Sequence, residues 1–149
     1  MQIIIIAPHP DDEIIGCWEI LNGVKKISVF YPNGADEGAL RACSKFKFNI
    51  ITELKWDLYC ALLAPDPIFE THPDHRQWGH YAENILRKGW SDVFFYSVNM
   101  QAPYIKKTVN PEKKKADLNA CYPEKYELWK YDHKYFLFEG RCSWNPIIG

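Results

Sequence analysis

The stretch QIIIIAPHPDDE at residues 2–13 decides the expected fold. Its first six residues are apolar almost without interruption and rich in β-branched isoleucine, which is typical of a strand buried on both faces of a parallel sheet. Pro8 ends this strand and begins a polar loop. Apolar residues then recur at helical spacing over residues 12–22, and a second strand is expected at residues 26–31. The chain is therefore predicted to open with a strand, a loop, a helix and a second strand.

Strands and helices continue to alternate along the rest of the chain. The expected elements are a helix at 37–46, a strand at 49–54, a segment at 56–63 whose type stays open, an extended stretch at 68–71, a helix that Gly89 ends, a strand at 92–98, a helix at 111–120 and an edge strand at 135–138. Such alternation predicts one α/β domain over residues 1–149 with a mainly parallel sheet.

Composition and charge limit the classes of partner. The chain has 149 residues, of which 47% are hydrophobic and 25% charged, as expected for one compact domain. Its 18 Lys and Arg residues nearly balance 19 acids, so no overall field favours nucleic acid or an anionic membrane. The longest aliphatic run, residues 3–7, is far shorter than the roughly 18 to 20 apolar residues of a membrane span. A local basic cluster is expected to be a solvated helix face rather than a phosphate site; it comprises Lys106, Lys107, Lys113, Lys114 and Lys115.

The cysteines and the N-terminus favour an intracellular protein. The five cysteines form no close pair, and their odd number argues against a disulfide framework, so buried thiols are expected. The N-terminus lacks the basic region of a signal peptide, which favours a cytoplasmic location. An aromatic content of 15% leaves self-association into a homo-oligomer open.

The tripeptide His-Pro-Asp occurs twice, in His9-Pro10-Asp11-Asp12-Glu13 and in His72-Pro73-Asp74-His75. Each copy lies between a predicted strand and a predicted helix. In open α/β sheets, ligands bind beyond the carboxyl ends of the strands, so two such loops can converge although they are far apart in sequence. The sequence therefore predicts one cleft that contains three histidines and three aspartates.

A simpler interpretation assigns these residues to helix ends. Asp11 or Asp12 would cap the first helix and Asp74 a later one, because aspartate accepts hydrogen bonds from free N–H groups there. The histidines would then be satisfied polar residues at strand ends. We favour a metal site, because both tripeptides are extended by a further residue of a metal-binding type.

A histidine and an aspartate three residues apart, with one distant histidine, form a ligand set that leaves an open position for water on Zn²⁺. Fe²⁺, Mn²⁺ and Co²⁺ suit the same ligands. A carboxylate left free beside the site can act as a general base, and a spare histidine can stabilise an oxyanion or protonate a leaving amine. These parts predict hydrolysis of an amide or ester, and they leave open which aspartate of the pair binds the metal.

Residues 7–13 closely resemble the first signature of the PIG-L/LmbE-like de-N-acetylases, and residues 72–76 resemble the second. Members of this family are zinc-dependent hydrolases that remove acetyl groups from N-acetylglucosaminyl substrates. The resemblance implies a short version of their three-layer Rossmann-like fold and an N-acetylated sugar or sugar conjugate as substrate. The short chain favours a nucleotide-linked or lipid-linked sugar whose bulk stays outside the pocket. The resemblance also implies that zinc is held by His9, Asp12 and His75, with Asp11 as general base, His72 as the group that stabilises the tetrahedral intermediate, and Asp74 as the residue that orients and charges His72.

Weaker similarities extend over most of the chain. Arg41 matches an arginine that helps to hold the substrate in this family, whereas Ser44, Pro123 and Glu124 depart from the family pattern. The departures concern the substrate more than the chemistry. They leave two alternatives open: hydrolysis of a non-sugar amide or thiol conjugate, and a catalytically silent metal-binding or glycan-binding protein.

Overall fold

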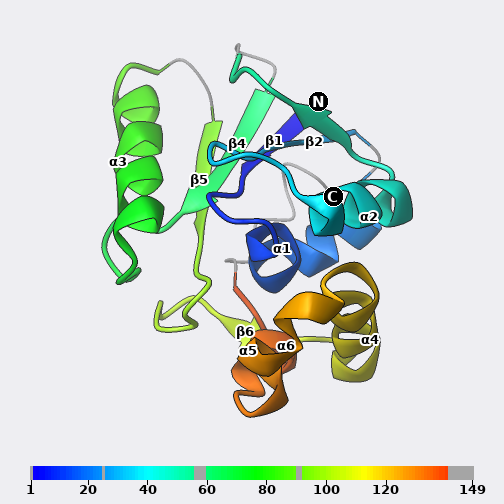
Figure 1. Cartoon of the computed structure of the whole chain (residues 1–149). Helices are drawn as coiled ribbons and strands as arrows, with labels where there is room; N and C mark the ends of the chain where they lie inside the picture. Colours follow the sequence, from blue (N-terminus) through cyan, green and yellow to red (C-terminus); the bar gives the residue numbers. More distant parts are fainter. Residues whose placement is uncertain (1, 25, 56–59, 90–91, 141–149) are drawn as a thin grey trace.

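The computed structural model describes residues 2–24, 26–55, 60–89 and 92–140, so Cys142 lies outside the described residues. Its centre is a five-stranded parallel sheet with the order β3-β2-β1-β4-β5 (Figure 1). The strands are β1 (Gln2–Ile6), β2 (Ile27–Phe30), β3 (Asn49–Ile51), β4 (Cys60–Pro65) and β5 (Asp92–Tyr96). The apolar residues of β1 are buried on both faces, which confirms β1 as the central strand.

Helices cover both faces of this sheet. The helical elements are α1 (Asp12–Gly23), α2 (Glu37–Phe46), α3 (Pro73–Arg87), α4 (Pro111–Cys121), the 3₁₀-helix η1 (Pro123–Lys125), α5 (Tyr126–Lys130) and α6 (Lys134–Leu137). Ile3 and Ile5 of β1 pack in one core with α1, α2 and α4, whereas Ile4 and Ile6 pack in a second core with α3. Successive strand residues point to opposite faces, so the two cores lie on opposite sides of the sheet. Figure 1 shows α3 well separated from α1 and α2. The α/β architecture with a parallel sheet flanked by helices is confirmed.

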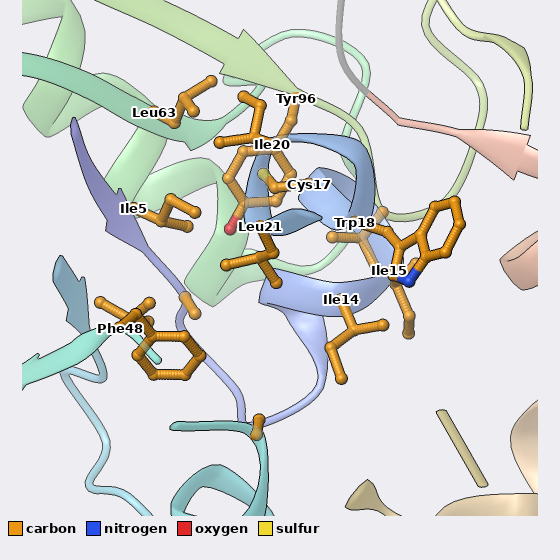
Figure 2. Packing of buried hydrophobic residues seen from close by; sticks show 14 of the residues in the cluster. Ile5, Ile14, Ile15, Cys17, Trp18, Ile20, Leu21, Phe48, Leu63 and Tyr96 are labelled. Carbon is orange, nitrogen blue, oxygen red and sulfur yellow. The ribbon is translucent and has the colours of Figure 1, made fainter. Parts of the chain in front are cut away.

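The helix α1 is held firmly against the sheet. Figure 2 shows its buried side chains beside Ile5 of β1, Leu63 of β4 and Tyr96 of β5. Gly16 permits this contact, because a Cβ atom there would lie 2.3 Å from Cδ2 of Tyr96. The hydroxyl of Tyr96 in turn donates to the carbonyl of Ile6 at 2.5 Å. This packing holds the start of α1 close to the end of β1.

Two predicted segments differ from the structure, and the structure shows the type of part of a third. The stretch at 68–71 is not extended. Ile68 and Phe69 lie in a turn, and Oδ1 of Asp66 accepts hydrogen bonds from their N–H groups. The expected edge strand at 135–138 is wrong: most of it forms α6, because Phe136 is buried against the core. Only its last residue joins β7 (Phe138–Glu139), which pairs with β6 (Lys106–Lys107) in a separate antiparallel sheet. Of the open segment 56–63, residues 60–63 belong to β4, and residues 56–59 lie outside the described residues.

Two sequence-based expectations agree with the described part of the chain. None of its helices is both long and apolar enough to cross a membrane. Three of its four cysteines are buried, namely Cys17, Cys60 and Cys121.

The expected solvated lysine face is wrong at one position. Lys114 is 0% exposed, and its ammonium donates to the carbonyls of Ile15 and Phe138, both at 2.7 Å. Burial lowers the pKa of Lys114, while the negative charge of Glu139 opposes that effect. Lys114 therefore ties α4 to α1 and β7 from inside the molecule.

We predict that Lys114→Met destabilises the protein by about 3 kcal/mol, because it removes the donor to the carbonyls of Ile15 and Phe138 and the positive charge that offsets the buried Glu139. Lys113→Met on the exposed side of the same helix is the matched control and should change stability little. Urea denaturation followed by circular dichroism measures both. Equal effects of the two substitutions would contradict the structural role of Lys114.

Candidate metal centre

The two His-Pro-Asp loops lie together at one edge of the sheet. The first follows β1, the second begins at His72, the N-cap of α3, and continues into the first turn of α3, and β1 and β4 are neighbours. The chain leaves these two strands toward opposite faces of the sheet, since α1 and α3 belong to different cores. Diverging connections of this kind leave a crevice at the carboxyl ends of the strands. Both loops border that crevice.

Three ligand atoms face one another in this crevice. Nδ1 of His9 lies 3.2 Å from Nε2 of His75, and that nitrogen lies 3.0 Å from Oδ2 of Asp12. Nδ1 of His9 and Oδ2 of Asp12 are 3.6 Å apart. Ligand atoms that surround Zn²⁺ tetrahedrally are about 3.3 Å from one another, given bonds of about 2.0 to 2.1 Å. The chemistry and spacing of these three atoms therefore fit a divalent cation.

Each of the two imidazole rings has a carboxylate behind it. Nδ1 of His75 lies 3.0 Å from Oε1 of Glu70, and Nε2 of His9 lies 2.9 Å from Oδ2 of Asp74. Metal-binding histidines usually donate their outer N–H to such a carboxylate, which fixes the tautomer and the orientation of the ring. Backbone N–H groups of Val98 and Asn99 hold Glu70 in turn. This second layer supports the fit to a metal.

The electrostatics of the cluster favour an ionised Asp12. Burial opposes its charge, but hydrogen bonds from His75 and His9 outweigh burial and lower the pKa of Asp12 to about 2. Burial also disfavours a charged His75, yet hydrogen bonds to Asp12 and Glu70 raise the pKa of His75 to about 10. A positive charge is thus strongly favoured between these carboxylates, as a proton or as a metal ion.

Asp11 is buried beside the cluster in an unusual backbone conformation. Its φ is 114°, its side chain is almost inaccessible to water, and Nζ of Lys125 lies 3.7 Å from its Oδ2. A non-glycine residue in this region costs on the order of 1–3 kcal/mol and is common at functional sites. Burial raises the pKa of Asp11 well above its ordinary value, Asp12 adds to that rise, and Lys125 opposes it.

The helix-capping interpretation does not hold for the aspartates. Asp11 precedes α1, but its side chain makes no capping hydrogen bond among the described residues. Asp12 already belongs to α1, and its carboxylate accepts the N–H of His9 at 2.9 Å. The cap of α3 is His72, whose Nδ1 accepts the N–H of Asp74 at 3.1 Å. These acids therefore serve the cluster and not the helix ends.

His72 is exposed at the edge of the cluster, with its ring 4.6 Å from that of His9 and 5.1 Å from that of His75. Because its Nδ1 accepts a backbone hydrogen bond, the neutral ring carries its proton on Nε2. The Asp74 carboxylate lies 2.9 Å from Nε2 of His9, whereas the hydrogen bond of Asp74 with His72 is made by its backbone N–H; ligand atoms of His9, His72 and Asp74 all lie within 4.8 Å of one another. The structure therefore pairs Asp74 with a candidate ligand, whereas the resemblance pairs it with His72.

A pocket of about 640 Å³ opens onto these side chains. Its described lining consists of His9, Asp11, Asp12, Ile15, His72, His75, Val98, Glu124, Lys125, Glu127, Leu128 and Tyr135. This volume is within the range of small-molecule sites. Arg41 lies outside that lining: its Nη2 donates to both oxygens of Glu124, at 2.9 and 2.8 Å.

Sequence reasoning missed several residues of the site. Glu70 had one usable signal, since it is an acid two residues before the second His-Pro-Asp. Lys125, Glu127 and Leu128 carried none, because only the packing of η1 and α5 brings them to the pocket.

Comparisons with models of protein families, with curated proteins and with solved structures find no match to this chain.

We predict that Glu70→Gln weakens Zn²⁺ affinity by about 10- to 100-fold. The substitution removes the negative charge beside His75, and the amide orients the imidazole ring less firmly than the carboxylate does. Glu83→Gln is a matched control, since Glu83 pairs with His80 at 2.8 Å on the outer side of α3. Competition with a chromophoric chelator measures the affinity. Unchanged Zn²⁺ affinity in a folded Glu70→Gln protein would contradict this role.

Proposed function

We propose that this chain is a divalent-metal-dependent hydrolase of the PIG-L/LmbE-like type, which removes the acetyl group from an N-acetylated sugar or sugar conjugate. The proposal takes Zn²⁺ as the cation, with Fe²⁺, Mn²⁺ and Co²⁺ as alternatives. One observation carries the hydrolase chemistry: two histidines, each backed by a carboxylate, converge with Asp12 beside the buried and strained Asp11. The family and the sugar substrate rest on the resemblance of residues 7–13 and 72–76 to the two signatures.

In this proposal His9, Asp12 and His75 hold the cation. A cation bound there would supply Lewis acidity toward a carbonyl oxygen and would lower the pKa of water beside it. Glu70 and Asp74 keep the two imidazoles in position. Asp11 does not belong to this ligand set, so its carboxylate is free to accept a proton.

The remaining residues of the pocket carry out the proton transfers. Asp11 accepts a proton from the attacking water, and the neighbouring ammonium of Lys125 favours the ionised carboxylate that this step requires. The Nε2–H of His72 donates a hydrogen bond to the carbonyl oxygen as it becomes negative. The bond between carbon and nitrogen then breaks, and the leaving amine takes a proton. The donor is Asp11, which returns the proton taken from water, or a protonated His72, whose proton Asp11 then replaces. The products are acetate and a free amine.

The decisive experiment is an assay of acetate release by zinc-loaded protein on N-acetylated sugars, nucleotide sugars and N-acylated thiol conjugates. We expect one metal ion per chain, measured by elemental analysis, and acetate from at least one sugar. Turnover of thiol conjugates alone would favour the non-sugar alternative. A bound metal without turnover of any compound would favour a silent binding protein and overturn the proposal.

Two adjacent substitutions test the assigned roles. Asp11→Asn should retain the metal and lower kcat by about 10²- to 10⁴-fold, because the amide cannot accept the proton. Asp12→Asn should lose most of the metal, because it removes a charged ligand. Metal content and kcat are measured on the same preparations. Metal loss in Asp11→Asn with retention in Asp12→Asn would reverse the assignment of the pair.

A further inference from the structure

The outer wall of the pocket is formed by η1 and α5. Its described side chains, here called the α5 rim, are Glu124, Lys125, Glu127 and Leu128. They surround the same cavity as Asp11 and His72. The α5 rim therefore faces the part of a substrate that is not hydrolysed, and its charges decide which substituents are accepted there.

The guanidinium next to the α5 rim is already paired. Nη2 of Arg41 donates to both oxygens of Glu124, and Nε donates to the carbonyl of Cys121 at 2.7 Å. Its Nη1 lies 3.9 Å from Oε2 of Glu37. Pairing of one guanidinium with two oxygens fixes the plane and direction of its donors. The charge of Arg41 is thus paired with Glu124, a residue of the pocket lining, whereas Arg41 itself is not part of the described lining.

The lysine of the α5 rim is committed in a similar way. Nζ of Lys125 donates to the carbonyl of Pro10 and lies 3.7 Å from Oδ2 of Asp11. Both partners belong to the loop that carries the proposed general base. The described lining of the pocket contains no other lysine and no arginine.

The rest of the α5 rim is acidic or apolar. The side chain of Glu127 is 74% exposed, and its ion-pair partner Lys130 lies at 3.8 Å on the same short helix. In an exposed ion pair of this kind, Lys130 offsets little of the negative charge that Glu127 presents to the pocket. Leu128 is half exposed beside it. A substrate group at the α5 rim thus meets the Glu124–Arg41 ion pair, Lys125 held against Pro10 and Asp11, the carboxylate of Glu127 and the side chain of Leu128.

We propose that the α5 rim selects uncharged or positively charged N-acyl compounds and rejects those that carry a phosphate, and that Glu124 enforces this selection by neutralising Arg41. This inference rests on the proposed function, since it names the substrate class of the same site. A phosphate binds well where unpaired N–H donors or a free cation face it. Here it would meet carboxylates and compete with Glu124 for Arg41.

The test compares N-acetylglucosamine with its 1-phosphate and its 6-phosphate, which place the phosphate at either end of the ring. Acetate release by zinc-loaded protein gives kcat/KM, and calorimetry with glucosamine and its two phosphates gives affinities without turnover. We expect the wild type to prefer N-acetylglucosamine and glucosamine over their phosphates at least about tenfold, because the carboxylates of the α5 rim repel a phosphate. Glu124→Gln should reduce that preference about tenfold for at least one isomer, because it frees the donors of Arg41.

Glu127→Gln is the matched control, since it removes the same charge from the α5 rim but frees no arginine. We expect it to change the preference less than about threefold, because an exposed charge is screened. The double variant Glu124→Gln/Arg41→Gln should lose the gain, with folding checked by thermal denaturation. The proposed selection would be overturned if Glu124→Gln and Glu127→Gln improved the use of phosphates equally. It would also be overturned if the wild type accepted phosphates as well as neutral sugars.

The two proposals fail in different ways. Preferential binding of the unphosphorylated amine without acetate release from any compound would support the selection and overturn the proposed function. Acetate release from all three sugars at similar kcat/KM would do the reverse. Absence of both binding and turnover would overturn both.

Discussion

The candidate site depends on the parallel pairing of β1 with β4. Their register sets Ile5 opposite Leu63, so both strands end at the same edge of the sheet. From there the chain turns to α1 on one face and, after a turn, to α3 on the other. Because these connections diverge, they leave room between them instead of filling it. The histidines of two loops far apart in sequence can therefore approach to within hydrogen-bonding distance.

Burial of negative charge is the main energetic demand of this arrangement. Four carboxylates around the crevice are almost inaccessible to water: Asp11, Asp12, Glu13 and Glu70. Backbone N–H groups donate to three of them, which offsets part of the cost of removing charge from water. Burial nevertheless raises the pKa of Glu13 to about 7, with Tyr122 donating a hydrogen bond to it. A positive charge at the centre of the cluster relieves this repulsion, and a divalent cation would do so most completely.

The predictions succeeded where local pattern and final environment agree. The isoleucines of β1 are continuous because both faces are buried, and the helix expected at 37–46 has these bounds in the structure. The segment of β4 stayed open because a short apolar run fits a buried strand and a buried helix equally. The prediction at 135–138 failed because the packing of Phe136, distant in sequence from its partners, overrides the local preference for a strand.

By itself the sequence determined the α/β class, the central strand and the two loops that carry ligand-type residues, because these follow from local periodicity and residue chemistry. Only the tertiary structure decided which partner each of these side chains contacts. It placed Asp74 behind His9, brought Glu70 behind His75, and paired Arg41 with Glu124 of the pocket lining. Those contacts join residues on different elements, and their geometry depends on how the helices pack on the sheet, which no local pattern encodes.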